Sequence, residues 1–157
     1  MNDIYAVEFS NITKRFGQVV ANEGVSFGVK KGEVLSLLGE NGSGKTTLMN
    51  MLSGIYHQDE GDIFIDGQKV VINSPKDAFD YKIGMVHQHF KLVDVFTGVQ
   101  NIALGNKDKK FSLKKIRDDA NSICEKYGFE IDLNKKIYDM SVSEKQTLEI
   151  IKVLYRG

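Results

Sequence analysis

The sequence contains few of the residues that cross-link or stiffen a chain. Its 157 residues include one cysteine, one proline and no tryptophan. The single cysteine, Cys124, cannot form an internal disulfide, which excludes the disulfide-rich secreted scaffolds and is typical of a reducing compartment. Because there is no Pro-rich or low-complexity stretch, the sequence shows no linker that would separate independent domains.

Long apolar runs and an excess of one charge are also missing. No run approaches the roughly 20 apolar residues of a transmembrane helix, and the residues after Met1 do not resemble a signal peptide. Lysine and arginine (21) balance aspartate and glutamate (21), so the basic surplus of a general nucleic-acid binder is absent. With 41% hydrophobic and 27% charged residues, the composition predicts a soluble, cytoplasmic, globular domain.

Short apolar segments in the first half of the chain predict β-strands. Apolar residues alternate from Val25 to Val29, as in a half-buried strand. The runs Glu33–Leu38 and Ile83–Val86 are more continuously apolar, which is typical of strands covered on both faces of a parallel sheet. Asp66-Gly67, flanked by apolar residues on both sides, predicts a hairpin with a type I′ turn.

Helix signals follow the β segments and dominate the second half of the chain. Each predicted helix has a capping serine, a glycine stop or a repeat of apolar residues at helical spacing. The predicted helices cover Thr46–Ser53 before Gly54, a segment starting at Ser74-Pro75, a segment from Ser112 to Gly128, and a segment starting at Ser141 that carries Leu148, Ile151 and Leu154.

The most specific motif is a glycine-rich loop between a predicted strand and a predicted helix. Residues 39–46, GENGSGKT, match the P-loop pattern G-x-x-x-x-G-K-[ST] at every fixed position. Glycines allow backbone N–H groups to approach phosphate oxygens, and the helix that follows directs its positive end to the same place. Lys45 would then provide a cation for the β- and γ-phosphates, and the Thr46 hydroxyl a ligand for Mg²⁺. The alternative, a glycine-rich turn that happens to precede a lysine, does not account for the strand and the helix on either side.

Five stretches together resemble the ATP-binding subunits of ABC transporters, and among them the importers of nucleosides and sugars. They are KRFGQ, GENGSGKTTLMNML, DEGDIFIDGQKV, IGMVHQHFKLVDVFTGVQNIALG and MSVSEKQTLEIIKVLYRG, in family order and spacing. The resemblance implies an α/β fold, the ABC-type P-loop NTPase core with an antiparallel β part and a helical subdomain. Residues 1–157 would form part of one ATPase domain, with the nucleotide-binding core at about 1–89 and the helical subdomain at about 90–157.

The resemblance also assigns roles to individual residues, with ATP and Mg²⁺ as the bound species. Phe16 would stack on adenine, although a phenylalanine at a strand end is by itself more often a core residue. Gln88 would offer its amide to Mg²⁺ and to the attacking water, so the implied catalytic set is Lys45, Thr46 and Gln88. The residues expected to contact ATP are Phe16, Gly39, Glu40, Asn41, Gly42, Ser43, Gly44, Lys45, Thr46 and Thr47. His87 and His89 flank Gln88, but one further histidine and one cysteine are too few to predict a structural metal site.

Residues 141–144 stand where the family has its signature, which binds the ATP held by a second ATPase domain. Ser141, Val142, Ser143 and Glu144 would present a helix N-terminus and a hydroxyl to that ATP. The match is incomplete, because Ser143 stands where a glycine is expected and Lys145 replaces a common glutamine. A capping box with no further role is the alternative interpretation.

The implied partners are membrane-spanning importer subunits, docked on the region from Gln88 to Phe96, and a second ATPase domain. The protein would lie at the cytoplasmic face of the membrane without touching the transported solute or nucleic acid. In the family, a strand with the Walker B aspartate and the catalytic glutamate follows the LYRG stretch. Since the sequence stops at Gly157, we expect a chain truncated before Walker B that binds ATP without efficient hydrolysis, and an intact subunit that is an ATPase.

Two other functions remain open from the sequence. One is a soluble ABC-type ATPase that acts on ribosomes or DNA, a group in which basic inserts or coiled-coil arms are common. The other is a stand-alone P-loop kinase or GTPase, which would need its own base-recognition or lid motif after the hairpin. The sequence shows none of these features, which favours the importer.

Overall fold

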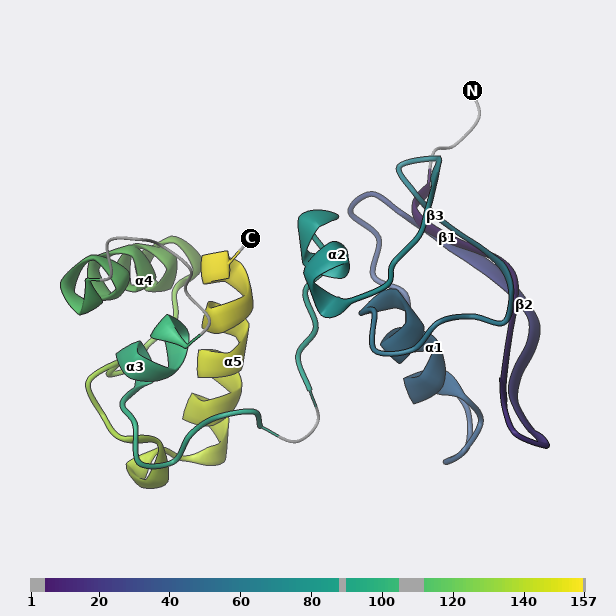
Figure 1. Ribbon diagram of the computed structural model, residues 1–157. Coiled ribbons are helices and arrows are strands. Elements are labelled where there is room, and N and C mark those ends of the chain that lie inside the picture. The colour runs from purple at the N-terminus through teal and green to yellow at the C-terminus, as the bar shows by residue number, and fades with distance from the viewer. Residues whose placement is uncertain (1–4, 88–89, 105–111, 157) are drawn as a thin grey trace. The chain divides into compact units, whose positions relative to one another are not determined.

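The computed structural model describes residues 5–87, 90–104 and 112–156, and the chain divides into two compact units between Ile83 and Gly84 (Figure 1). Over the described residues, the first unit is a sheet with two short helices and the second is helical, so the fold is mixed α/β as predicted. No helix within these described residues has both the length and the apolar character that crossing a membrane requires.

The first unit contains a four-stranded sheet in the order β2-β1-β3-β4, with every neighbouring pair antiparallel. Its strands are β1 Tyr5–Phe16, β2 Val19–Lys30, β3 Glu60–Ile65 and β4 Gln68–Val70. The predicted strand at Val25–Val29 is part of β2. The predicted hairpin is also confirmed: Ile65 pairs with Gln68, and both turn residues have positive φ (Asp66 50°, Gly67 76°), as a type I′ turn requires.

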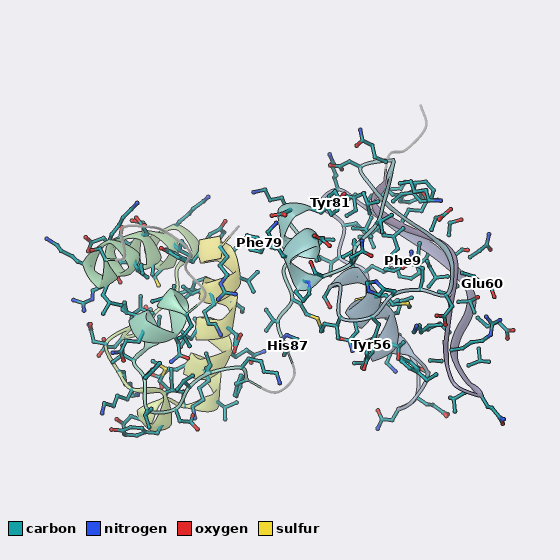
Figure 2. The ribbon with its side chains drawn as sticks, viewed as in Figure 1. Phe9, Tyr56, Glu60, Phe79, Tyr81 and His87 are labelled. Atoms are coloured by element: carbon teal, nitrogen blue, oxygen red, sulfur yellow. The ribbon has the colours of Figure 1, made fainter. Side chains whose placement is uncertain are left out.

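One face of this sheet is covered by α1 (Lys45–Leu52), and the two elements share a hydrophobic core. Leu48 and Met51 of α1 are buried against Phe9 and Ile12 of β1 and Ile63 of β3. Phe9, labelled in Figure 2, stacks on Phe27 of β2 with ring centroids 4.8 Å apart. This packing fixes α1, and therefore the glycine-rich loop at its N-terminus, on the sheet.

The ends of both helices in this unit follow from local sequence signals. The predicted helix at Thr46–Ser53 is α1, which ends at Leu52 and is followed by Gly54 in the left-handed conformation (φ 72°). α2 (Pro75–Asp80) begins as predicted, with the Ser74 hydroxyl accepting a hydrogen bond from the Asp77 N–H.

Two predicted strands, Glu33–Leu38 and Ile83–Val86, do not form in the structure. Both segments are described, but neither has a ladder partner among the described residues, where β1 to β4 pair only with one another. A strand exists through hydrogen bonds to its neighbour, so an apolar run without a partner stays irregular. Val34 (93% exposed) and Leu38 (92%) are accordingly unburied, although Leu37 packs against the sheet core.

In the part of the second unit that the structure describes, three helices pack around a separate core. They are α3 Gly98–Ala103, α4 Leu113–Tyr127 and α5 Val142–Arg156, with a short 3₁₀ turn, η1, at Ile137–Asp139 before α5. Each helix contacts the other two, and Ile102, Ile116, Ile137, Leu148 and Ile151 are almost completely buried between them.

The helix boundaries of this unit also match the sequence signals. The Ser112 hydroxyl accepts from the Lys115 N–H at the start of α4, and Gly128 (φ 70°) ends that helix. Thr97 caps α3 through a reciprocal capping box with Gln100.

Candidate functional site: the glycine-rich loop

The loop that precedes α1 adopts a backbone that depends on its glycines. Gly42 (φ 86°) and Gly44 (φ 84°) are in the left-handed region that residues with a Cβ rarely adopt. The Ser43 N–H donates to the Glu40 carbonyl at 3.2 Å, which closes a turn between the glycines. Glu40 and Asn41 are exposed at the outer part of this turn. The sequence therefore folds into a compact loop rather than into an extension of a strand or helix.

The side chain of Lys45 lies across this loop. Its Nζ donates to the Gly39 carbonyl (2.8 Å), the Glu40 carbonyl (2.8 Å) and the Ser43 hydroxyl (3.0 Å). An ammonium has three N–H donors, so all of them are directed at loop oxygens. The loop thus encircles a positive charge at the position where the sequence predicts a phosphate-binding cation.

The N-terminus of α1 is suited to an anion. Gly44 is the N-cap and has no side chain, so no side chain accepts a hydrogen bond at this cap. The N–H groups of the first turn, which contains Thr46 and Thr47, add to the positive end of the helix dipole. Lys45 begins the helix, and no acidic residue lies in its first turn. These features fit a phosphate group, which needs several convergent donors.

Strand β2 contacts the loop through Asn22, a residue that the sequence analysis did not single out. The Asn22 amide Nδ2 donates to the Gly44 carbonyl at 3.3 Å, and Asn22 is only 8% exposed. Its Oδ1 is buried and has no hydrogen-bond partner among the described residues. An asparagine inside a strand is the only sequence signal that could have pointed to this contact.

Phe16 lies at the end of β1 in the same unit and keeps 43% of its surface exposed. Its ring meets Tyr56, labelled in Figure 2, edge to face with centroids 5.1 Å apart. Lys14 Nζ lies 5.4 Å from the Phe16 ring centroid. The exposed ring is compatible with base stacking, and its contact with adenine stays a prediction.

The remaining predicted residues belong to the second unit or lie outside the described residues. Gln88 and His89 are outside them, whereas His87 and Phe90 are described. The described residues contain no group of three or more His, Cys, Asp or Glu side chains that could hold a metal ion. Of the two predicted Mg²⁺ ligands, Thr46 lies within the described residues and Gln88 lies outside them.

Ser141 and Glu144 form a reciprocal capping box at the start of α5. The Ser141 N–H donates to Glu144 Oε2 at 2.7 Å, and the Glu144 N–H donates to Ser141 Oγ at 3.2 Å. Lys135 Nζ contacts both carboxylate oxygens of Glu144, at 3.0 and 3.1 Å. Val142 and Ser143 occupy the first turn, and Val142 is 71% exposed. The capping role is thus present in the geometry, and the contact of residues 141–144 with ATP stays a prediction.

This geometry makes α5 sensitive to acid. The Ser141 N–H, followed by the Lys135 ammonium, lowers the pKa of Glu144 from 4.5 to about 2. A carboxylate with a depressed pKa stabilises the folded state above its ordinary pKa, and that stabilisation is lost as the pH falls towards the folded-state value. We therefore expect the N-terminal turn of α5 to weaken between about pH 4.5 and about pH 2.

An NMR titration of the Glu144 side-chain carboxyl checks this prediction. The midpoint should lie near pH 2, and it should move upward in Lys135→Met, which removes the ammonium that helps to hold the charged form. A midpoint near 4.5 in the unaltered chain would contradict the capping geometry.

Comparison with known proteins places this loop in a family. Residues 22–157 match the family model described as ABC transporter. The guanosine import ATP-binding protein NupO of Bacillus subtilis (strain 168) is 49% identical over 156 residues, which cover 98% of this chain and 31% of that protein. The nucleoside import ATP-binding protein NupA of Lactococcus lactis subsp. cremoris (strain MG1363) is 46% identical, covering 96% of this chain and 30% of NupA. A ribose import ATP-binding protein of Caldanaerobacter subterraneus is 38% identical.

Solved structures share the fold. An ATP-binding cassette of an ABC transporter in its ADP conformation superposes with a TM-score of 0.84 at 26% identity, covering 98% of this chain and 65% of that one. A dimeric cassette in a post-hydrolysis state, bound to ADP and Pi, gives a TM-score of 0.73 at 25% identity, covering 96% and 69%. The chain thus spans under a third of the two nucleoside-import relatives and about two thirds of the single cassettes.

Proposed function

The chain belongs to the ABC transporter family, and we propose that it forms the phosphate-binding part of an ATP-binding subunit that drives import of a nucleoside or a sugar. The observation that carries the proposal is the geometry of the loop of residues 39–47. The helix N-terminus that follows it has no side-chain cap, and the Lys45 ammonium is hydrogen-bonded to the loop carbonyls. The relatives are named as import ATP-binding proteins, which supports the importer over a ribosome- or DNA-acting ATPase.

Each loop residue has a role that follows from its chemistry. The backbone N–H groups from Gly42 to Thr47 bind the phosphate oxygens, and Lys45 neutralises their charge. Phe16 stacks on the adenine ring. Mg²⁺, when bound, offsets the charge of the β- and γ-phosphates, and the Thr46 hydroxyl and Gln88 are the residues of this chain that would hold it.

The second unit provides the contacts with other subunits in this proposal. Ser141–Glu144 face the ATP of a second ATPase domain, and the region from Gln88 to Phe96 docks the membrane-spanning subunits. The protein then lies at the cytoplasmic face of the membrane. Support comes from the dimeric cassette that shares the fold and from the import proteins that the chain resembles.

A nucleoside is the favoured solute class. The stretches MVHQHFKLVDVFT and INSPKDA look more like the nucleoside importers than the ribose importers. The identities point the same way, at 49% and 46% for two nucleoside-type relatives against 38% for a ribose-type relative.

Thermal unfolding with and without MgATP tests the proposal. At a ligand concentration of 100 times the dissociation constant, binding should stabilise the folded chain by about 2.7 kcal/mol. The shift should disappear in Lys45→Ala and persist in Lys114→Ala, which removes an exposed lysine of α4. A dye is the suitable readout because the chain has no tryptophan. A cooperative transition that MgATP leaves unmoved would refute ATP binding by this loop.

A further inference from the structure

Helix α5 carries a buried carboxylate, that of Glu149, next to an otherwise apolar core. Glu149 is 3% exposed and lies between Leu148 and Ile151, which belong to the apolar core of the second unit. Glutamate is almost never fully buried unless it is paired, because desolvation of its charge is unfavourable. Its partners therefore indicate what its charge does.

These partners are the backbone of one residue and a neighbouring lysine. Glu149 Oε1 accepts from the Lys91 N–H at 2.8 Å and from Lys152 Nζ at 3.3 Å. Lys152 Nζ also donates to the Lys91 carbonyl at 2.9 Å. The Glu149 and Lys152 side chains are 5% and 12% exposed, so solvent screens this ion pair little. Two residues one turn apart on α5 thus bind both the N–H and the C=O of Lys91.

A second buried side chain binds the same segment a few residues later. Asn101 of α3 is 0% exposed; its Oδ1 accepts from the Val93 N–H at 2.7 Å. Its Nδ2 donates to the carbonyls of Val93 and Thr97, each at 3.1 Å. Residues 90–96 contain no helix or strand, so these side chains replace the backbone hydrogen bonds that regular structure would provide. The apolar side chain of Val95 is left 65% exposed on this fixed segment.

We propose that Glu149 and Lys152 are positioning residues that tie the segment Lys91–Phe96 to α5. The proposal rests on the proposed function, in which this segment docks the membrane subunits. Ser141 lies immediately before α5, and Glu149 is eight residues further, about 12 Å along the helix at 1.5 Å per residue. ATP contacts at the Ser141 end and partner contacts at the Lys91 end are therefore made by one rigid helix, and a displacement at either end moves the other.

This connection between the segment Lys91–Phe96 and α5, called the linkage below, predicts a local effect of removing the charges of Glu149 and Lys152. The variant Glu149→Met/Lys152→Met replaces a buried ion pair by apolar side chains of similar length, a change that folded proteins commonly tolerate. Amide exchange of Lys91 should accelerate about tenfold or more, while amides in the middle of α4 keep their protection. Glu125→Gln, at an exposed position of α4, should change neither. A Lys91 amide that stays protected in the double variant would overturn the proposal.

The functional readout uses the full-length subunit assembled with its membrane subunits in nanodiscs. The double variant should lose about tenfold of the ATPase rate that the membrane subunits stimulate, with the KM for ATP within twofold of the unaltered protein. If the double variant keeps its stimulated ATPase rate while its Lys91 amide exchanges freely, the linkage is overturned and the proposed function is not. An unaltered protein that no membrane subunit stimulates would refute the proposed function, and the linkage with it.

Discussion

Replacing Gly44 by alanine should abolish the stabilisation of the chain by MgATP and lower its free energy of unfolding by about 3 kcal/mol. Two effects add at this position. Gly44 has a φ of 84°, and a residue with a Cβ loses about 1–2 kcal/mol in the left-handed region. A Cβ would also lie 2.2 Å from the Ala21 carbonyl oxygen and 2.6 Å from Asn22 Nδ2. Because the Ala21 contact is backbone of β2, the loop itself must move.

Gly42→Ala is the matched control within the same loop. Gly42 has a similar φ of 86°, but a Cβ there would meet nothing within 4 Å. The control should therefore lose only the backbone contribution, about 1–2 kcal/mol. Urea unfolding followed by circular dichroism measures both variants. An equal loss of unfolding free energy in the two variants would show that the contact of the loop with β2 does not contribute to stability.

Replacing Asn101 by leucine should destabilise the second unit by about 3 kcal/mol, even though the two side chains are similar in size. Asn101 is completely buried and makes three hydrogen bonds, which leave Val93 N–H, Val93 C=O and Thr97 C=O paired. Leucine offers neither a donor nor an acceptor. The Val93 N–H would then have no acceptor, which costs about 1–3 kcal/mol for a buried donor. The carbonyls of Val93 and Thr97 keep the N–H groups of Phe96 (3.1 Å) and Asn101 (3.0 Å), so loss of the two Asn101 Nδ2 bonds adds about 0.5–1.5 kcal/mol each.

Asn101→Asp separates the three bonds. An aspartate still accepts from the Val93 N–H, but it cannot donate to the two carbonyls. Amide exchange should then show the Val93 amide still protected in Asn101→Asp and unprotected in Asn101→Leu. A Val93 amide that exchanges at the same rate in both variants would contradict the assigned hydrogen bond.

Features encoded in a few consecutive residues could be predicted from the sequence. The Asp66-Gly67 hairpin and the caps at Ser74 and Ser112 form as expected, because each depends on residues within four positions of one another. The glycine-rich loop belongs to the same class, since its positive φ angles are a property of glycine itself.

Features that depend on distant partners could not be predicted. The runs Glu33–Leu38 and Ile83–Val86 have the composition of strands, but composition does not supply a neighbouring strand. No strand was predicted at β1, for a related reason. Irregularities in its pairing, one of them between Phe9 and Ile12 where Asn11 has a φ of 51°, interrupt the alternation that identifies a strand.

Buried polar side chains were missed in each of the two units. Asn22 in β2 and Glu149 in α5 are typical of exposed positions when the sequence is taken alone. Their importance comes from the Gly44 carbonyl and the Lys91 backbone, which are 22 and 58 residues away in the chain. The sequence therefore predicted the loop itself, whereas the contacts of Asn22 and Glu149 depend on tertiary packing.

The hydrogen bonds of Lys45 have a consequence for how tightly the loop can hold a nucleotide. Its ammonium already has three oxygen partners in the loop, at 2.8, 2.8 and 3.0 Å. A phosphate that recruits this charge must exchange with those partners, so the net gain is the difference between two sets of bonds. Such an exchange makes the affinity lower than it would be if the Lys45 ammonium had no partners to give up. An import ATPase of the proposed kind must release its spent nucleotide in every cycle, and a limited affinity suits that release.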